Sequence, residues 1–336
     1  MVRATRFTDP ASVDAWDNWF RWREPDCLHD RTIDATWSRV AHAIVPREDP
    51  EGQRWAHRYI DAFSRWQLLP DERLLRMAGT GPGLTDLESP CATLNVAAFV
   101  IAPHTRQARF DGERFGHIAA LAVRMLDDAL TAVHGRLPHA AALRIGLIGF
   151  ADALHLLGIG YDDARAVEHA NMIGTTLACG TLHGALELTG ERGPLGAPPQ
   201  HLLSIWRDRR VPDALIDAAA WNGVRHSRLT MIEPQPRLAL LANHASDALD
   251  PQPDSAPGSV AHVSVEPASA CAGNASATAR KVIRAAIQPW IDTPIDYPLM
   301  ACGKRDARAL ASSVHTDSCQ SLRVRSPSQP PTSEPT

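Results

Sequence analysis

The stretch from Leu143 to Ala166 constrains the fold more than any other part of the sequence. It opens with a short apolar run, and a helical pattern of apolar residues follows directly. Gly146 and Gly149 lie in and just after the run, where glycine allows close approach of another backbone. A dinucleotide-binding loop would need a further glycine and a following acidic residue, and the sequence around Gly146 and Gly149 lacks both. These two glycines are therefore only weak evidence for such a loop. The stretch therefore predicts a buried strand followed by a helix.

Long helices are predicted on both sides of this unit. From Phe110 to Val133 apolar residues recur three or four positions apart over several turns, as in an amphipathic helix. A second helix is expected from about Ala164 to Leu188, capped by Asp162 or Asp163 and ending before Gly190. Together with the strand, these patterns indicate a mainly helical α/β protein.

The N-terminal part of the chain is also predicted to be helical. Tryptophans and aliphatic residues between positions 13 and 66 recur at helical spacing, which is typical of helices that pack on one another. Asp34 is a candidate cap for the helix that carries Trp37. With 336 residues, of which 44% are hydrophobic, the chain can bury a substantial core.

Charge and cysteine usage narrow the partners and the compartment. The formal net charge of -4 and the pI near 6.4 give no reason to expect nucleic acid or an acidic membrane surface as a partner. The sequence lacks a membrane-length apolar run and the apolar core of a signal peptide, so we expect a cytoplasmic protein. Its six cysteines contain no Cys-x-x-Cys pair and are expected to be reduced thiols.

Several segments, taken in chain order, share motifs with one enzyme family. They are Thr32 to Ile44, Leu68 to Gly81, Glu88 to Val100, Leu143 to Ala166, Arg225 to Pro251 and Lys281 to Met300. In the fourth, Gly146, Asp152 and Tyr161 fit a Leu-Gly-x-x-Gly-Leu-Ala-Asp pattern and its continuation. Through these motifs the chain resembles the large chains of ribonucleotide reductases, most closely the adenosylcobalamin-dependent class. The shared order carries the resemblance more than any single motif does.

This resemblance implies a partial ribonucleotide-reductase-like barrel with an N-terminal helical region. The helical region is expected at 1–80 and the partial α/β barrel at 81–251. A Pro-, Ser- and Ala-rich flexible linker is expected at 252–279, because that stretch has no periodicity. A residual reductase-like helix at 280–300 and a disordered tail at 301–336 complete the prediction.

The resemblance also assigns candidate site residues. Cys91, in the segment ESPCATLNVAAFV, matches one half of the cysteine pair that is oxidised when the substrate is reduced. Asn95 of the same segment, and Pro234, Gln235 and Arg237 of the loop that lies against the substrate phosphates, are the implied substrate-binding residues. The alternative for Cys91 is a small buried residue at the end of a strand. We expect no metal site, because Cys179 and His183 are only two ligands, four residues apart on one helix.

The sequence departs from the family where the chemistry resides. The Asn-Pro-Cys-x-Glu motif, which supplies the radical cysteine and its carboxylate, occurs nowhere in the chain. The hydroxyl and glycine positions of the phosphate loop read Gln235, Pro236, Arg237 and Ala239, and proline has no N–H to donate. We therefore predict a ribonucleoside-diphosphate reductase-like protein whose contribution to deoxyribonucleotide synthesis is impaired or absent.

Other readings of the function stay open. The chain could be a non-catalytic nucleotide-binding protein or interaction partner of an intact reductase, an interaction module without a nucleotide site, or one piece of a split reductase completed by a second chain. The resemblance implies adenosylcobalamin as cofactor, although a degenerate relative would need none. It also implies a ribonucleotide or an intact reductase chain as partner, with a thioredoxin-like reductant if the protein is active.

Overall fold

The computed structural model describes residues 4–46, 51–135, 137, 139–198, 200–209, 211–252 and 275–298. The predicted tail at 301–336 lies outside these residues, as does the predicted linker from 253 to 274.

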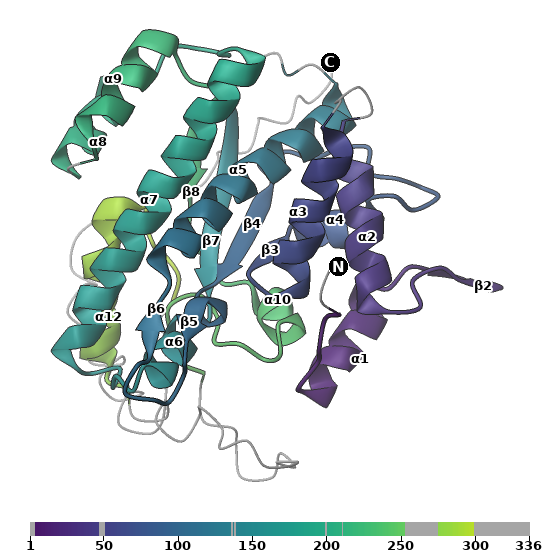
Figure 1. The fold of residues 1–336 in the computed structure, drawn as a ribbon, viewed down its shortest axis with the longest axis horizontal. Coiled ribbons are helices and arrows are strands. Elements are labelled where there is room, and N and C mark those ends of the chain that lie inside the picture. The colour runs from purple at the N-terminus through teal and green to yellow at the C-terminus, as the bar shows by residue number, and fades with distance from the viewer. Residues whose placement is uncertain are drawn as a thin grey trace, which may run out of the picture.

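A four-stranded sheet forms the centre of the fold, in the strand order β3-β4-β7-β8 (Figure 1). Its strands are β3 (Leu68–Pro70), β4 (Cys91–Asn95), β7 (Ala141–Ile148) and β8 (His226–Thr230). β3 runs antiparallel to β4, whereas β4, β7 and β8 are parallel to one another. Two small hairpins, β1 (Arg23–Glu24) with β2 (Cys27–Leu28) and β5 (Val100–Ile101) with β6 (Arg109–Phe110), lie apart from it. The predicted mainly helical α/β class is confirmed.

Helices connect the parallel strands and cover one face of the sheet. α5 (Gly112–His134) leads from β4 to β7, and α7 (Ala164–Arg192), α8 (Gln200–Asp208) and α9 (Asp213–Asn222) lead from β7 to β8. In Figure 1, α5 and α7 lie in front of the sheet, and α5 contacts both β4 and β7. The short elements that complete this part are η1 (Val96–Phe99) and α6 (Phe150–Leu156).

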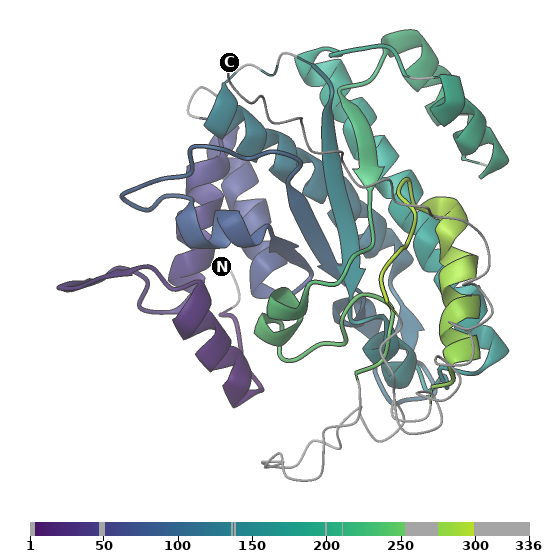
Figure 2. The same cartoon turned by 180° about the vertical axis from the view of Figure 1, so that it is seen from behind.

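The opposite face of the sheet is covered by the chain that follows β8. Figure 2 shows α10 (Pro236–Leu241) and its flanking segments on this side. The segment crosses β7 so closely that a Cβ atom at Gly146 would lie 2.6 Å from the Met231 carbonyl oxygen. Glycine at position 146 is therefore required for the two segments to pack.

The N-terminal region is helical, as predicted, and joins the same core as the sheet. It contains α1 (Pro10–Trp19), α2 (Ile33–Ile44), α3 (Gly52–Ser64) and α4 (Glu72–Met77). Trp37 and Phe63 are fully buried, with ring centroids 5.4 Å apart. The predicted cap Asp34 is wrong: Thr32 caps α2 by accepting from the Ala35 N–H, and Asp34 instead accepts from Thr5. A cap must precede the first helical residue, and Asp34 is already inside the helix.

The end of α7 also differs from the prediction. Asp163 caps its start as expected, but the helix continues through Gly190 to Arg192. Arg192 donates to Asp127 Oδ2 at 2.6 Å and to Asp128 Oδ1 at 2.5 Å, both on α5. This pairing stabilises the last turn of α7, so the helix tolerates Gly190 in that turn.

A buried ion cluster joins α5, α7 and the start of β8. We use this name for Asp127, Asp128, Arg192, Arg225 and His226. Asp127 is fully buried, and its Oδ1 lies 2.8 Å from Arg225 Nε and 3.0 Å from His226 Nε2. Burial alone would raise the pKa of Asp127, but His226 and Arg225 outweigh it and hold this pKa below its usual range. The cluster therefore fixes a carboxylate inside the protein.

The sheet is open, so the partial barrel is not confirmed by its strand pairing. Near the end of β8, the carboxylate of Asp292 accepts from the N–H groups of Leu229 and Thr230, at 2.9 and 3.1 Å. Asp292 also pairs with Arg209 at 2.8 Å. At the other edge, β3 is only three residues long and includes Pro70, which has no N–H for a further strand.

The last described segment packs against α7. It holds α12 (Ala277–Ile287), capped by Ser276, and η2 (Gln288–Trp290). α12 begins three residues before the boundary predicted at 280. Within the described residues, none of the helices combines the length and apolar character needed to cross a bilayer.

Candidate functional site

The strand β4 presents its polar side chains to the chain that follows β8. Because side chains alternate along a strand, Cys91, Thr93 and Asn95 share one face and Ala92 and Leu94 the other. Thr93 is the register partner of Gly146, and a Cβ atom at Gly146 would point at the Met231 carbonyl oxygen. The face that carries Cys91 is therefore turned away from α5, toward the segment after β8.

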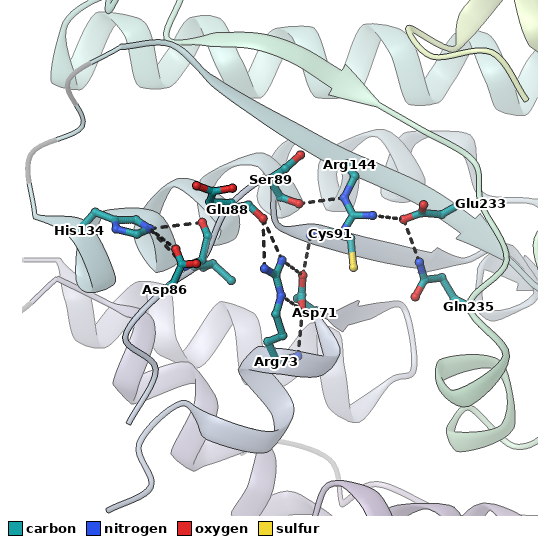
Figure 3. A network of polar contacts seen from close by, with 11 residues as sticks. Asp71, Arg73, Asp86, Glu88, Ser89, Cys91, His134, Arg144, Glu233 and Gln235 are labelled. Atoms are coloured by element: carbon teal, nitrogen blue, oxygen red, sulfur yellow. Dashed lines mark hydrogen bonds and ion pairs between the residues drawn. The ribbon is translucent and has the colours of Figure 1, made fainter. Parts of the chain in front are cut away.

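Cys91 lies at the start of β4 and is only 6% exposed. Its backbone N–H donates to Asp71 Oδ2 at 2.9 Å, as Figure 3 shows. Burial raises the pKa of the Cys91 thiol well above its ordinary value, and the negative charge of Asp71 adds to this effect. Thiol–disulfide exchange proceeds through the thiolate, and this environment disfavours the thiolate of Cys91.

The carboxylate of Asp71 is held by Arg73. Arg73 donates from its side chain to both Asp71 oxygens, at 3.0 and 2.8 Å, and to the Glu88 carbonyl. Asp71 also caps α4 by accepting from the Arg73 backbone N–H at 2.8 Å. Burial would raise the pKa of Asp71, but these hydrogen bonds outweigh it and lower the pKa. Asp71 thus ties α4 to β4 as a carboxylate and is not a proton donor.

A second ion pair connects β7 to the segment after β8. Arg144, the register partner of Cys91, donates to Glu233 Oε1 at 2.6 Å and to the Ser89 carbonyl at 2.8 Å. Glu233 Oε1 also accepts from the side-chain amide of Gln235 at 3.1 Å. Figure 3 shows Cys91 between this pair and the Asp71–Arg73 pair. Each cation of the site therefore already has an anionic partner.

Three of the predicted substrate-binding residues lie in or beside this site. Pro234 and Gln235 follow Glu233 directly, and the Gln235 backbone N–H is taken by Asp247 Oδ1 at 2.7 Å. Arg237 pairs with Glu72 at 3.2 Å and lies over the Trp19 ring, 5.4 Å from its centroid. An incoming phosphate would have to compete with these carboxylates, so the loop is not organised to receive an anion.

Asn95, the fourth predicted substrate-binding residue, lies at the opposite end of β4. Four strand residues span about 13 Å, so the structure does not bring Asn95 to Cys91. Asn95 is buried, and its Oδ1 has no hydrogen-bond partner among the described residues. This oxygen lies 2.2 Å from where a Cβ atom at Gly149 would stand. Gly149 has a φ of 71°, so glycine at 149 accommodates both the turn and the Asn95 side chain.

Reasoning from the sequence missed Asp71, Arg144 and Glu233. A charged residue within the apolar strand LRIGLIG was a usable signal for Arg144, because a half-buried arginine needs a partner. The partner itself was not predictable, since Glu233 lies 89 residues away in the chain.

The described residues contain no group of three or more His, Cys, Asp or Glu side chains placed to hold a metal ion. Cys179 is half-buried on α7, and His183 Nε2 lies 3.1 Å from Glu187 Oε1. The two residues therefore form no larger ligand set in this part of the chain.

Fold and site together define a class of α/β protein. Helical crossovers cover one face of the three parallel strands β4, β7 and β8, and a cysteine at the start of β4 faces the other side. Residues 87–255, half of the chain, match the family model for the ribonucleotide reductase barrel domain. The chain belongs to the ribonucleotide reductase family, and the kinship predicted from its motifs is confirmed.

Known proteins match a smaller part of the chain. It is 28% identical over 114 residues to the ribonucleoside-diphosphate reductase subunit alpha of Chlamydia pneumoniae, and equally to that of Chlamydia muridarum. Each alignment covers 32% of this chain and 11% of the relative. The chain thus aligns with about a tenth of the length of these curated relatives.

Proposed function

We propose that this chain is a ribonucleotide reductase-family protein that does not reduce ribonucleotides by itself. The observation that carries the proposal is the state of Cys91: it is buried, its pKa is raised, and its neighbours form closed ion pairs. The other described cysteines are Cys27 on β2 and Cys179 on α7, so within the described residues no second thiol lies on the β4 face. The absence of an Asn-Pro-Cys-x-Glu sequence supports the same conclusion.

We propose further that the open sheet is a remnant of the family's barrel. Helices α5 and α7 cover the same face of the parallel strands β4, β7 and β8. Such one-sided winding is the arrangement of a barrel, whereas an open doubly wound sheet carries helices on both faces. In the remnant, the segment after β8 occupies the side that would be the barrel interior.

The proposal includes the loss of the phosphate-binding loop. Pro236 is the first residue of α10 and offers no N–H, while the Gln235 N–H is engaged by Asp247. Arg237, the loop's cation, is paired with Glu72. These contacts favour a structural role for the loop.

Adenosylcobalamin, which the resemblance implies, does not fit the described residues. This cofactor would supply radical chemistry to a cysteine beside an open site. No cysteine lines the cavity beside Trp55 and Arg124 or the cavity between α3 and α5, and Cys91 is buried between ion pairs. We therefore propose that the chain works without the cofactor.

A reductase assay tests the main proposal. The purified chain is given a ribonucleoside diphosphate, adenosylcobalamin and a dithiol, with an intact reductase of the same class as the positive control. We expect no deoxyribonucleotide above the protein-free background. Turnover that disappears in the variant Cys91→Ser would refute the proposal, because it would show that this thiol exchanges electrons.

Association with an intact reductase chain is the second candidate function. The specific observation that favours it is the match to the reductase barrel domain in a sequence that contains no Asn-Pro-Cys-x-Glu motif. We expect the chain to co-elute with an intact reductase in size-exclusion chromatography. A ribonucleotide at a hundred times its dissociation constant would add about 2.7 kcal/mol of stability to a nucleotide-binding protein. The absence of both co-elution and this thermal shift would leave only the module without a nucleotide site.

A further inference from the structure

A basic groove lies between α3 and α5, and its lining includes none of the residues of the site around Cys91. We use this name for the cavity of about 370 Å³ walled by Arg54, His57, Arg58 and Asp61 of α3 and by Arg114 and His117 of α5. These residues recur three or four positions apart, so each helix turns one stripe of side chains into the groove. Ile118 and Leu121, 2% and 5% exposed, form an apolar lining. The groove is thus a pocket with an apolar base and mainly cationic walls.

The carboxylate of Asp61, which lines the groove, is already paired with two arginines. Asp61 accepts from Arg65 Nε at 2.9 Å and lies 3.2 Å from Arg114 Nη2. Arg54 pairs with Glu51 at 3.1 Å, and both side chains are more than half exposed. Pairs of this kind are weak, because water screens them. Three arginines against one shared aspartate leave the groove with an excess of positive charge.

Arg58 is the centre of this excess. Its guanidinium lies 4.6 Å from the centroid of the Trp55 ring, and no ion pair or hydrogen bond joins it to a carboxylate in the described part of the chain. Burial lowers the pKa of Arg58, and the neighbouring cations Arg54, Arg124 and Arg114 lower it further. The Arg124 guanidinium also lies over the Trp55 ring, at 3.9 Å. The Arg58 guanidinium is therefore repelled by Arg54, Arg114 and Arg124, although Arg124 is itself paired with Glu191.

We propose that the basic groove binds a compact, multiply charged phosphate anion of the diphosphate type, free or carried by a small molecule. Guanidinium groups pair with phosphate oxygens two at a time, and a bound diphosphate would relieve the repulsion around Arg58. Three of these arginines, Arg54, Arg58 and Arg114, line one cavity of about 370 Å³, which suits a compact anion better than an extended acidic peptide.

Isothermal titration of the whole chain with inorganic pyrophosphate tests this proposal. We expect one saturable site whose affinity falls as salt is raised, because the attraction is electrostatic. Arg58→Ala should weaken binding about tenfold or more, and Arg58→Lys less, since lysine keeps the charge but not the paired donors. Arg207→Ala is the matched control, because Arg207 is an exposed arginine on α8. It should change the affinity less than about twofold.

Two further arms make the outcome decisive. Circular dichroism of each variant must match the parent, and Arg58→Lys serves if Arg58→Ala fails to fold. A nucleoside diphosphate that binds more tightly than pyrophosphate would identify a small-molecule carrier, and equal affinities would identify the free anion; both support the site. The proposal is overturned if pyrophosphate shows no saturable binding at low salt, if Arg58→Ala and Arg207→Ala behave alike, or if an acidic peptide binds more tightly than pyrophosphate.

Discussion

Replacement of Asp127 by asparagine tests whether the buried ion cluster holds α5, α7 and β8 together. The change removes the charge that Arg192, Arg225 and His226 share, over distances of 2.6, 2.8 and 3.0 Å. Asp127 is fully buried and the Arg225 side chain is 8% exposed, so water cannot replace the lost partner. Breaking a buried pair by removing one partner costs about 3–5 kcal/mol.

The assay is thermal and urea unfolding of Asp127→Asn beside the parent chain. A loss of this size corresponds to a fall in melting temperature of roughly 4–7 °C for a chain of this length. Asp128→Asn is the matched variant in the same cluster. Burial raises the pKa of Asp128, so a neutral side chain is less costly there and the loss should be smaller. Asp17→Asn, which disrupts a surface pair with Arg21, should cost at most about 1 kcal/mol.

The same cluster predicts a pH dependence. The pKa of Asp127 is lower in the folded chain than its ordinary value of 3.8, so the folded state binds its proton less readily. Its stabilising contribution is therefore present above the unfolded pKa and is lost as the pH falls through and below it. We expect the parent chain to lose stability from about pH 5 downward, with a shallower slope in Asp127→Asn. An Asp127→Asn variant within 1 kcal/mol of the parent, with an unchanged acid slope, would refute the reasoning.

Two further predictions concern the crossing over β7 and the thiols. Gly146→Ala should destabilise the chain by about 1–3 kcal/mol, because its Cβ atom would meet the Met231 carbonyl oxygen. The control Gly190→Ala, whose Cβ atom would lie in open space on α7, should stabilise the chain by about 0.5–1 kcal/mol. Equal effects of the two variants in urea unfolding would contradict the close packing at Gly146. Iodoacetamide should label exposed Cys27 at least about ten times faster than buried Cys91, as followed by peptide mass spectrometry, and comparable rates would show that the Cys91 pocket opens readily.

The sequence predicted those helices and strands that are determined by the apolar pattern of their own residues. The period of Phe110 to Val133 gave α5 to within two residues, and the run at Leu143 gave β7 and α6. Elements decided by distant partners were not predictable in the same way. α7 passes Gly190 because Arg192 meets Asp127 and Asp128, which lie 65 and 64 residues earlier.

The candidate site shows the same division. The motif around Cys91 placed the cysteine on a strand, and the strand is β4. The raised pKa of its thiol follows from burial that only the assembled fold creates and from Asp71, which supplies negative charge 20 residues away in the chain. Asn95 shares the motif with Cys91 but lies at the other end of the strand, a separation that a linear motif does not express.

The edges of the central sheet limit how a second chain could add strands to it. A donated strand that paired with β8 would first have to remove Asp292 from the Leu229 and Thr230 amides and break its pair with Arg209. At the other edge it would meet only three residues, one of them Pro70. Addition of a strand is thus disfavoured at both edges of the sheet. A partner chain could bind to the helical surfaces without first breaking these contacts.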